Sequence, residues 1–258
     1  MTSVNRGIKV VIPARYGSTR LPGKPLIDLC GEPMIVRVAN RVSKALPLAD
    51  LWVATDDLRI KDVVKASGYQ AMLTSTHHES GTDRIAEIAE KLCWSDDEII
   101  INIQGDEPLI DIDLLKKFAV FCVNHESLSM ASVMVPMTSL VDINDSNVVK
   151  VITNKSGDAS MFSRSPLPFC RDLPLNEWPI ESFNRHVGIY AYKACVIREL
   201  SNSTPCQSEK LEKLEQLRAL WLGCTISMLR WDQTLHAGID SLDDVLRVRN
   251  VLNNKLDW

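Results

Sequence analysis

The stretch that decides the fold is residues 9–25, which read Lys-Val-Val-Ile-Pro-Ala-Arg-Tyr-Gly-Ser-Thr-Arg-Leu-Pro-Gly-Lys-Pro. The apolar run that ends at Pro13 is typical of a short strand buried on both faces. The loop that follows, residues 13–25, has three cations, two aliphatic hydroxyls and two glycines, and no acidic residue. In a doubly wound sheet such a loop lies at the carboxyl edge, where ligands bind.

Strand and helix patterns alternate through the first half of the chain. Further strands are expected at 51–54, 70–73 and 98–103, and helices at 33–46, 57–66, 82–92 and 112–123. Strands that alternate with helices of about 10–15 residues predict βαβ units and a mostly parallel sheet.

After residue 128 the pattern changes to strands separated by loops, which are expected at 129–137, 148–153, 159–162 and 187–192. Four prolines punctuate the irregular stretch 165–184. A helix at 209–222, a strand at 225–229 and a helix at 242–252 complete the chain. We therefore predict a single α/β domain over 1–258 with an inserted strand-rich lobe at about 129–195.

Composition excludes several classes of protein. The 258 residues include 29 Lys and Arg against 33 Asp and Glu, a net charge of −4, which argues against a nucleic-acid binder. The apolar runs are too short to span a bilayer, and because polar residues and Arg6 interrupt residues 1–9, we expect no signal peptide. Seven scattered cysteines without a Cys-x-x-Cys pair predict free thiols rather than a disulfide framework or a zinc site. We expect a cytoplasmic protein.

The loop at 13–25 has the composition of a polyphosphate site. Its glycines supply backbone N–H groups, and Arg15, Arg20 and Lys24 supply positive charge. It is not a Walker A loop, because Pro25 stands where a hydroxyl residue is required, and it lacks the Gly-x-Gly-x-x-Gly pattern. The alternative is a solvated basic loop.

Two carboxylates from distant parts of the chain are candidate magnesium ligands. Asp106 follows the apolar run 99–103 and would emerge at the same edge as the basic loop. Asp240 precedes the last helix; the alternative is that either carboxylate caps a helix. Arg84 is expected in the first turn of a helix, where the dipole disfavours a cation, which indicates that it serves a ligand.

Seven colinear blocks resemble the CMP-Kdo synthetases, the cytidylyltransferases that activate 3-deoxy-manno-octulosonic acid (Kdo). The blocks are 13–25, 80–84, 102–108, 162–164, 185–190, 214–218 and 238–240. The resemblance implies a Rossmann-like nucleotide-diphospho-sugar transferase fold that forms a homodimer through the inserted lobe. It also implies Mg²⁺-dependent transfer of CMP from CTP to the anomeric hydroxyl of the sugar, with release of pyrophosphate, for lipopolysaccharide biosynthesis.

The resemblance also implies the roles of individual residues. By similarity, the triphosphate is held by Arg15, Ser18, Arg20 and Lys24, the cytidine side by Arg84, Gln104 and Gly105, magnesium by Asp106 and Asp240, and the sugar acid by Arg164, His186, Tyr190, Glu215 and Gln216. Arg15, Lys24 and Asp106 would be the catalytic set, since positioning and charge neutralisation dominate such transfers. We expect a magnesium-bound alkoxide as the nucleophile, with Asp106 holding the metal. From the residues alone, His186, Tyr190 and Glu215 could instead be structural.

The chain departs from the family pattern near the expected sugar pocket, at Gln207–Glu209 and at Thr234–Ala237. The departures favour either simple loop drift or a modified sugar, 8-amino-3,8-dideoxy-manno-octulosonate, whose ammonium could meet Ser208 or His236. Two other functions remain open: a cytidylyltransferase for another acidic sugar such as a sialic acid, and a non-catalytic nucleotide-binding regulator.

Overall fold

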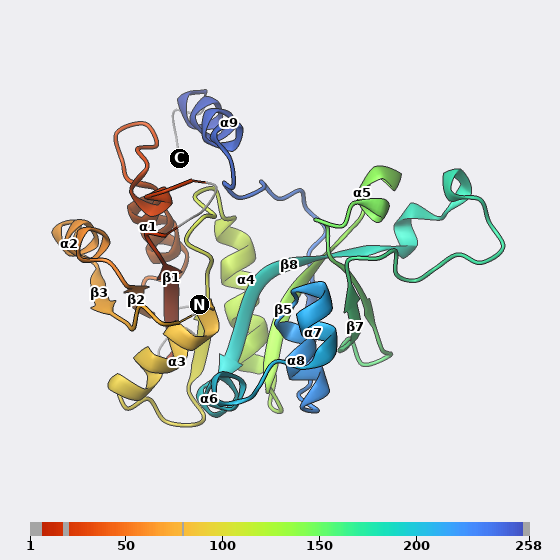
Figure 1. The fold of residues 1–258 in the computed structure, drawn as a ribbon, viewed down its shortest axis with the longest axis horizontal. Helices are drawn as coiled ribbons and strands as arrows, with labels where there is room; N and C mark the ends of the chain where they lie inside the picture. The colour runs from red at the N-terminus through yellow and green to blue at the C-terminus, as the bar shows by residue number, and fades with distance from the viewer. Residues whose placement is uncertain (1–6, 18–20, 79, 255–258) are drawn as a thin grey trace.

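The computed structural model describes residues 7–17, 21–78 and 80–254. Within them one nine-stranded sheet runs through the molecule in the order β3-β2-β1-β4-β8-β5-β9, and β6 and β7 extend it beside β8 (Figure 1). The strands are β1 (Lys9–Ala14), β2 (Asp50–Thr55), β3 (Gln70–Leu73), β4 (Ile99–Asn102), β5 (Met130–Pro136), β6 (Lys150–Thr153), β7 (Ala159–Ser163), β8 (Asn184–Lys193) and β9 (Ile226–Arg230).

The directions of the strands confirm the predicted mostly parallel sheet. Strands β3, β2, β1 and β4 are mutually parallel, and β5 is parallel to β9. The long strand β8 runs antiparallel to both β4 and β5 and so joins the two parallel blocks. The carboxyl ends of β1 and β4 therefore meet at one edge, as the sequence predicts for the loops that follow them.

Helices cover both faces of the sheet because alternate strand residues are apolar on both sides. Val10 and Ile12 of β1 pack with α1, α2 and α4, whereas Val11 packs with α3 and α6. The α-helices are α1 (Met34–Ala45), α2 (Leu58–Ala66), α3 (Gly81–Lys91), α4 (Ile112–Asn124), α5 (Leu140–Asn144), α6 (Ala194–Asn202), α7 (Gln207–Glu212), α8 (Gln216–Trp221) and α9 (Leu242–Asn253). In such a three-layer arrangement, ligands commonly bind at the carboxyl ends of the strands.

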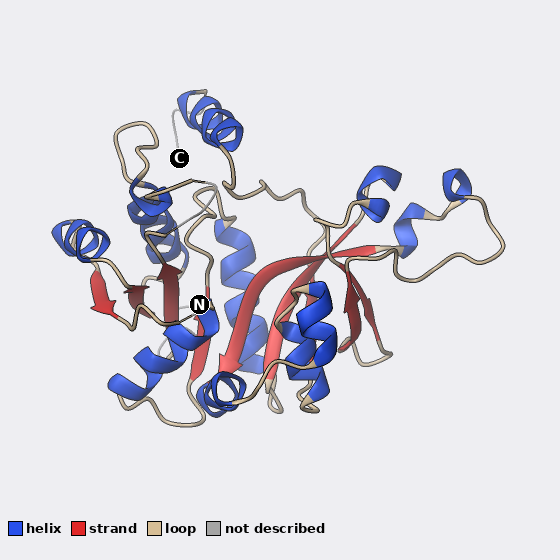
Figure 2. Cartoon of the chain, in the orientation of Figure 1, coloured by secondary structure: helices blue, strands red, loops and turns tan. Residues whose placement is uncertain are grey.

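The segment predicted as an inserted lobe contributes to two parts of the structure. Strands β5 and β8 lie in the middle of the sheet, β6 and β7 extend the sheet beside β8, and α5 and the segment 164–183 project beyond it (Figure 2). Trp178 and Phe183 stack with ring centroids 5.6 Å apart and form a small separate core with Met137 and Ile143. Strands β5 and β8 of this segment thus belong to the central sheet, and the bounds 129–195 for a lobe stay a prediction.

The expected helix at 209–222 is two helices. The first, α7, ends at Glu212 and is followed by the C-cap residue Lys213 in a left-handed conformation with φ of 53°, and α8 begins at Gln216. Helix α6, which follows β8 without an intervening turn, has no counterpart in the predicted pattern.

The C-terminal helix α9 packs on the segment that carries the basic loop. Val245 and Val248 of α9 are buried against Leu21, Leu29 and Met34. Figure 1 shows α9 on the side of the molecule that carries α1. None of the described helices has the length and apolar composition needed to cross a lipid bilayer.

Candidate active site

A cleft opens at the carboxyl ends of β1 and β4, beside the first turn of α3. It is lined by Pro13, Ala14, Arg15, Lys24, Pro25, Met34, Ser80, Gly81, Arg84, Gln104, Gly105, Asp106 and Asp240. The structure thus brings together six predicted nucleotide and metal residues, Arg15, Lys24, Arg84, Gln104, Gly105 and Asp106, with Asp240 as the seventh. Ser18 and Arg20, which were predicted to hold the triphosphate, lie outside the described residues.

The Lys24 ammonium lies between the two predicted metal carboxylates. Its Nζ donates to Asp106 Oδ2 at 2.7 Å and to Asp240 Oδ1 at 3.1 Å. Lys24 is only 12% exposed, whereas Asp106 is 35% and Asp240 57% exposed. The two carboxylates therefore converge on a single cationic point at the mouth of the cleft.

A closed turn presents Lys24 at this position. The backbone N–H of Gly23 donates to the Tyr16 carbonyl at 3.1 Å, which returns the chain to the end of β1. Gly23 has φ of 68°, and a Cβ there would lie 3.2 Å from the Tyr16 ring. Arg59 covers the same ring at 3.5 Å from its centroid. Glycine at position 23 is therefore required both by the conformation and by the ring.

Close backbone contacts also fix Asp106 and Asp240. A Cβ on Gly105 would lie 2.9 Å from the Pro13 carbonyl oxygen, so β1 and the residues after β4 touch at this point. The N–H of Ile239 donates to the Asp106 carbonyl at 2.9 Å and so anchors the residue next to Asp240. These contacts bring carboxylates from distant parts of the chain to one site.

Neither carboxylate is a helix cap. Helix α9 is capped by Ser241, in a capping box with Asp244, and α4 is capped by Asp111. The capping alternative for Asp106 and Asp240 is therefore wrong. No group of three or more His, Cys, Asp or Glu side chains among the described residues could hold a metal by itself. Two hard oxygen donors beside a basic loop instead fit Mg²⁺, which commonly takes one or two carboxylates and completes its shell with water and phosphate.

Arg84 is held by protein groups of its own. The residue is 3% exposed, and its Nη2 donates to Asp56 Oδ2 at 2.7 Å while Nη1 donates to Thr74 Oγ1 at 2.9 Å. Nη1 also donates to the Ser75 carbonyl at 3.1 Å. The guanidinium thus braces the wall of the cleft, and Asp56 is its unpredicted partner. Asp56 directly follows β2 at the same carboxyl edge, which is the signal that could have identified it.

Several residues predicted for the sugar lie together on the other side of β4. The His186 ring lies 5.3 Å from the Tyr190 ring on β8, and its Nε2 is 2.9 Å from Ser132 Oγ. Burial lowers the pKa of His186 to about 3, so the ring is neutral at physiological pH. Burial also raises the pKa of the Tyr190 hydroxyl, which stays protonated. This wall therefore offers neutral polar groups.

Glu215 and Gln216 enter this region from the break between α7 and α8. Gln216 is 6% exposed. Glu215 Oε1 accepts from Arg218 Nη2 at 3.1 Å, and burial raises the pKa of its carboxyl while Arg218 opposes that rise. Glu209 forms a second ion pair with Arg218, at 3.1 Å. The Glu215–Arg218 ion pair is thus largely enclosed.

Arg164 follows β7 and is held by α7. Its Nε donates to the Glu212 carbonyl at 2.6 Å, and its Nη1 donates to the Ser146 carbonyl at 2.7 Å. Its backbone N–H donates to Glu212 Oε2 at 2.6 Å. The guanidinium is therefore fixed by backbone carbonyls, without a carboxylate in direct contact among the described residues.

The two residues considered for sugar specificity lie on different elements. Ser208 is on α7, where its Oγ lies 3.3 Å from Cys206 Sγ. His236 lines a second pocket together with Glu107 and Arg185, at the ends of β5 and β9. Burial, reinforced by the adjacent Asp106 carboxylate, raises the pKa of Glu107 to about 7. Glu107 is a partly buried acid to which the sequence analysis gave no role.

Comparison with known proteins defines the class. The family model described as cytidylyltransferase matches residues 9–226. A solved structure of a cytidylyltransferase from Leptospira borgpetersenii, 16% identical, covers 98% of this chain and 89% of its own with a TM-score of 0.63, which shows the shared fold. The family model covers most of the chain, which therefore belongs to the cytidylyltransferases.

More similar proteins define the family. A 3-deoxy-manno-octulosonate cytidylyltransferase 2 from Paraburkholderia phytofirmans is 50% identical over 246 residues, which are 95% of this chain and 94% of that protein. The solved structure of CMP:2-keto-3-deoxy-manno-octonic acid synthetase complexed with CTP superposes with a TM-score of 0.88 at 37% identity, over 96% of this chain and 99% of its own. The chain belongs to the CMP-Kdo synthetase family, as the seven blocks indicate.

Proposed function

We propose that this protein transfers CMP from CTP to the anomeric hydroxyl of Kdo and releases pyrophosphate, with Mg²⁺ as the cofactor. The observation that carries the proposal is the convergence of Asp106 and Asp240 on the Lys24 ammonium inside the cleft. A cation and two carboxylates at one point suit a metal-bound polyphosphate better than they suit an uncharged ligand. The names of the related proteins, which refer to this sugar and to CTP, support the same substrates.

The nucleotide side of the reaction depends on charge and position. Lys24 and the exposed Arg15 bind the triphosphate, while Asp106 and Asp240 would hold Mg²⁺. When bound, Mg²⁺ neutralises phosphate charge and favours ionisation of the attacking hydroxyl. Gly105 lets the backbone after β4 approach closely, and the braced Arg84 keeps the opposite wall in place. Phosphoryl-type transfer needs little covalent chemistry from the protein, so these positioning roles carry most of the catalysis.

On the sugar side, Arg164 provides the positive charge and the other groups provide hydrogen bonds. Neutral His186 and the protonated Tyr190 hydroxyl suit the hydroxyl groups of a sugar, and Glu215 and Gln216 add acceptors. Arg164 is the member of this set that can pair with the sugar carboxylate. A sialic acid would need a different arrangement of hydroxyl partners, because that sugar carries an acylated amine.

Pyrophosphate release in the presence of CTP, Mg²⁺ and purified protein tests the proposal. We expect turnover with Kdo that stops when EDTA removes the metal. We expect Asp106→Asn to abolish turnover while CTP binding stays measurable, with Asp113→Asn on the exposed face of α4 as the matched control. Turnover by D106N at the wild-type rate would refute the metal role, and no release with Kdo would refute the substrate.

The same assay with 8-amino-3,8-dideoxy-manno-octulosonate decides whether the departures at 207–209 and 234–237 matter. A higher kcat/KM for the amino sugar would identify it as the substrate. Ser208 and His236 would then be the first positions to substitute. A higher kcat/KM for Kdo would show that these departures leave the sugar unchanged.

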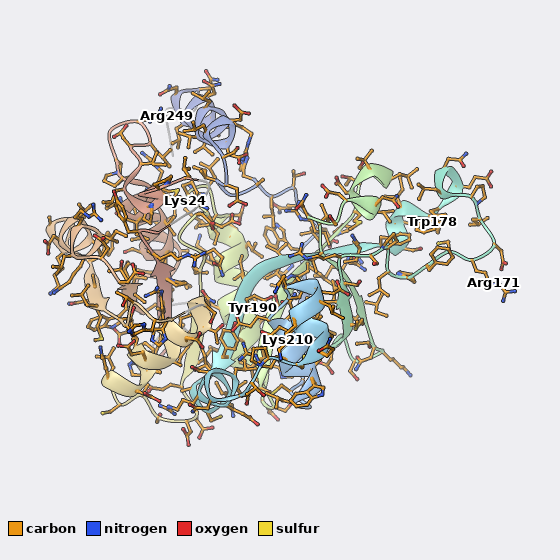
Figure 3. All side chains as sticks on the ribbon, viewed as in Figure 1. Lys24, Arg171, Trp178, Tyr190, Lys210 and Arg249 are labelled. Carbon is orange, nitrogen blue, oxygen red and sulfur yellow. The ribbon has the colours of Figure 1, made fainter. Side chains whose placement is uncertain are left out.

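Two further parts of the proposal concern assembly and setting. Phe169, Leu173 and Leu175 are 71%, 44% and 44% exposed on the projecting segment that also carries Arg171 and Trp178 (Figure 3). We expect the protein to form a homodimer through this apolar surface. In sedimentation experiments the wild type should then be a dimer and the variant Phe169→Asp a monomer. We place the reaction in the cytoplasm, where CTP is available.

A further inference from the structure

Lys150 on β6 is a buried cation for which the mechanism above has no use. Its side chain is 0% exposed, and its Nζ donates to the carbonyls of Asp145 at 3.0 Å and Val148 at 2.7 Å, and to that of Arg164. All three acceptors are backbone carbonyls. The ammonium therefore ties the turn at 145–148 to the residue that follows β7.

Removing the Lys150 ammonium from water costs free energy, which the hydrogen bonds that it makes must offset. Burial lowers the pKa of Lys150, and the carboxylates of Asp145 and Glu212 offset part of that effect. A methionine of similar length would fill the same space without desolvating a charge. What lysine adds at this position is the set of three hydrogen bonds.

The turn at 145–148, Lys150 and Glu212 together hold Arg164. Lys150 fixes the carbonyls of residues 145 and 148, and between them the Ser146 carbonyl accepts from Arg164 Nη1 at 2.7 Å. Lys150 also binds the Arg164 carbonyl, while Glu212 binds the Arg164 backbone N–H and Nε. The Arg164 guanidinium is thus held in one orientation, and no described residue accepts a hydrogen bond from its Nη2.

We propose that Lys150 is a positioning residue that orients Arg164 toward the carboxylate of the acidic sugar. The inference rests on the proposed function, because Arg164 acts there on the sugar acid. Lys150 itself contacts neither substrate, and its effect passes through the turn at 145–148 and the Arg164 backbone. The nucleotide cleft lies at β1 and β4 and shares no residue with this group.

Steady-state kinetics of Lys150→Met test the proposal. We expect the KM for Kdo to rise about tenfold or more, as for the loss of a hydrogen bond to a charged group, while kcat and the Kd for CTP stay within about twofold. The matched control is Lys155→Met, an exposed lysine in the turn between β6 and β7, which should leave all three constants unchanged. An unchanged KM for Kdo in K150M, or an equal loss of CTP affinity, would overturn the proposal.

A double-mutant cycle separates positioning from general destabilisation. If Lys150 acts only through Arg164, the variant that combines K150M with Arg164→Met will have the same KM for Kdo as R164M alone. Additive effects would show that Lys150 acts by another route. If K150M does not fold, Lys150→Gln, which keeps two N–H donors near the carbonyls, replaces it in the same cycle.

The crystal structure of ligand-free K150M provides a readout that needs no substrate. We expect Arg164 Nη1 to lose its contact with the Ser146 carbonyl, and an undisturbed contact would overturn the proposal. If the wild type is inactive with Kdo, only the proposed function is refuted. The position of Arg164 in the K150M structure still tests whether Lys150 orients that side chain.

Discussion

The position of Lys24 predicts that this residue competes with the metal in the absence of nucleotide. Its ammonium lies 2.7 Å from Asp106 and 3.1 Å from Asp240, at the point where the two carboxylates converge. A divalent cation that binds both carboxylates must first displace the ammonium. Lys24→Met removes the competing charge and keeps the length of the side chain, so the free protein should bind metal more tightly.

The size of the effect follows from the exposure of the two ion pairs. Asp106 is 35% and Asp240 57% exposed, so solvent screens both pairs and each contributes about 0.5–1 kcal/mol. Loss of both pairs corresponds to about 1–2 kcal/mol, or a gain of roughly 5- to 30-fold in metal affinity. The same variant should lose pyrophosphate release, because Lys24 also binds the triphosphate in the proposed function.

Titration with Mn²⁺, followed by the electron paramagnetic resonance signal of the free ion, measures this affinity without nucleotide. Lys44→Met, at an exposed position on α1, is the control for a change in net charge and should bind Mn²⁺ like the wild type. Unchanged or weaker Mn²⁺ binding by K24M would refute the idea that the ammonium and the metal share one position.

Three further predictions concern stability. Gly105→Ala places a methyl carbon 2.9 Å from the Pro13 carbonyl oxygen, so urea unfolding should show a loss of about 1–3 kcal/mol; an unchanged midpoint would contradict the close approach. Because burial lowers the pKa of His186 from 6.5 to about 3, the folded state resists protonation and loses stability as pH falls below 6.5. The unfolding free energy of His186→Gln should therefore fall by about 2 kcal/mol less between pH 6.5 and about pH 5 than that of the exposed control His77→Gln. Equal falls in the two variants would exclude this contribution of His186. Lys213→Gly should raise the unfolding free energy by about 0.5–1 kcal/mol, because φ is 53° there, and a loss would show that the Lys213 side chain stabilises the turn.

The first half of the fold was predictable because its signals are local. Each strand from β1 to β4 is a short apolar run, and each helix between them has an apolar stripe at helical spacing. A buried parallel sheet requires this pattern, so periodicity alone identifies the elements and the edge where their loops meet.

The second half was less predictable because contacts between distant segments decide it. Strand β8 lies antiparallel between β4 and β5, and its own residues do not encode that position. Helix α6 was missed because it follows β8 without glycine, proline or another turn signal. The helix at 209–222 was predicted as continuous because the non-glycine residue Lys213 gives no sign of the left-handed conformation that ends α7.

The candidate site shows the same division. Asp106, in the loop after β4, could be assigned to the cleft from sequence, because the end of a parallel strand fixes where the following loop emerges. Gln104 was assigned only from the resemblance to the family. A cation in the first turn of a helix indicated that Arg84 binds a ligand, but the Asp56 carboxylate on the loop after β2 also pairs with this cation. Lys150 gave no signal in the sequence, since a lysine in a strand is ordinarily exposed.

Asp240 shows how the C-terminal helix becomes part of the cleft. It is 57% exposed, and its backbone N–H donates to Asp244 Oδ2 in the first turn of α9 at 3.1 Å. Ile239 is buried against Leu21 and Leu29 and is joined to the Asp106 carbonyl, and α9 packs on the same apolar group. Because Leu21 precedes Lys24 in the basic loop, one small core positions both the lysine and the second carboxylate. Substitutions in the buried face of α9 should therefore weaken metal and CTP binding together, although no residue of that helix lines the cleft.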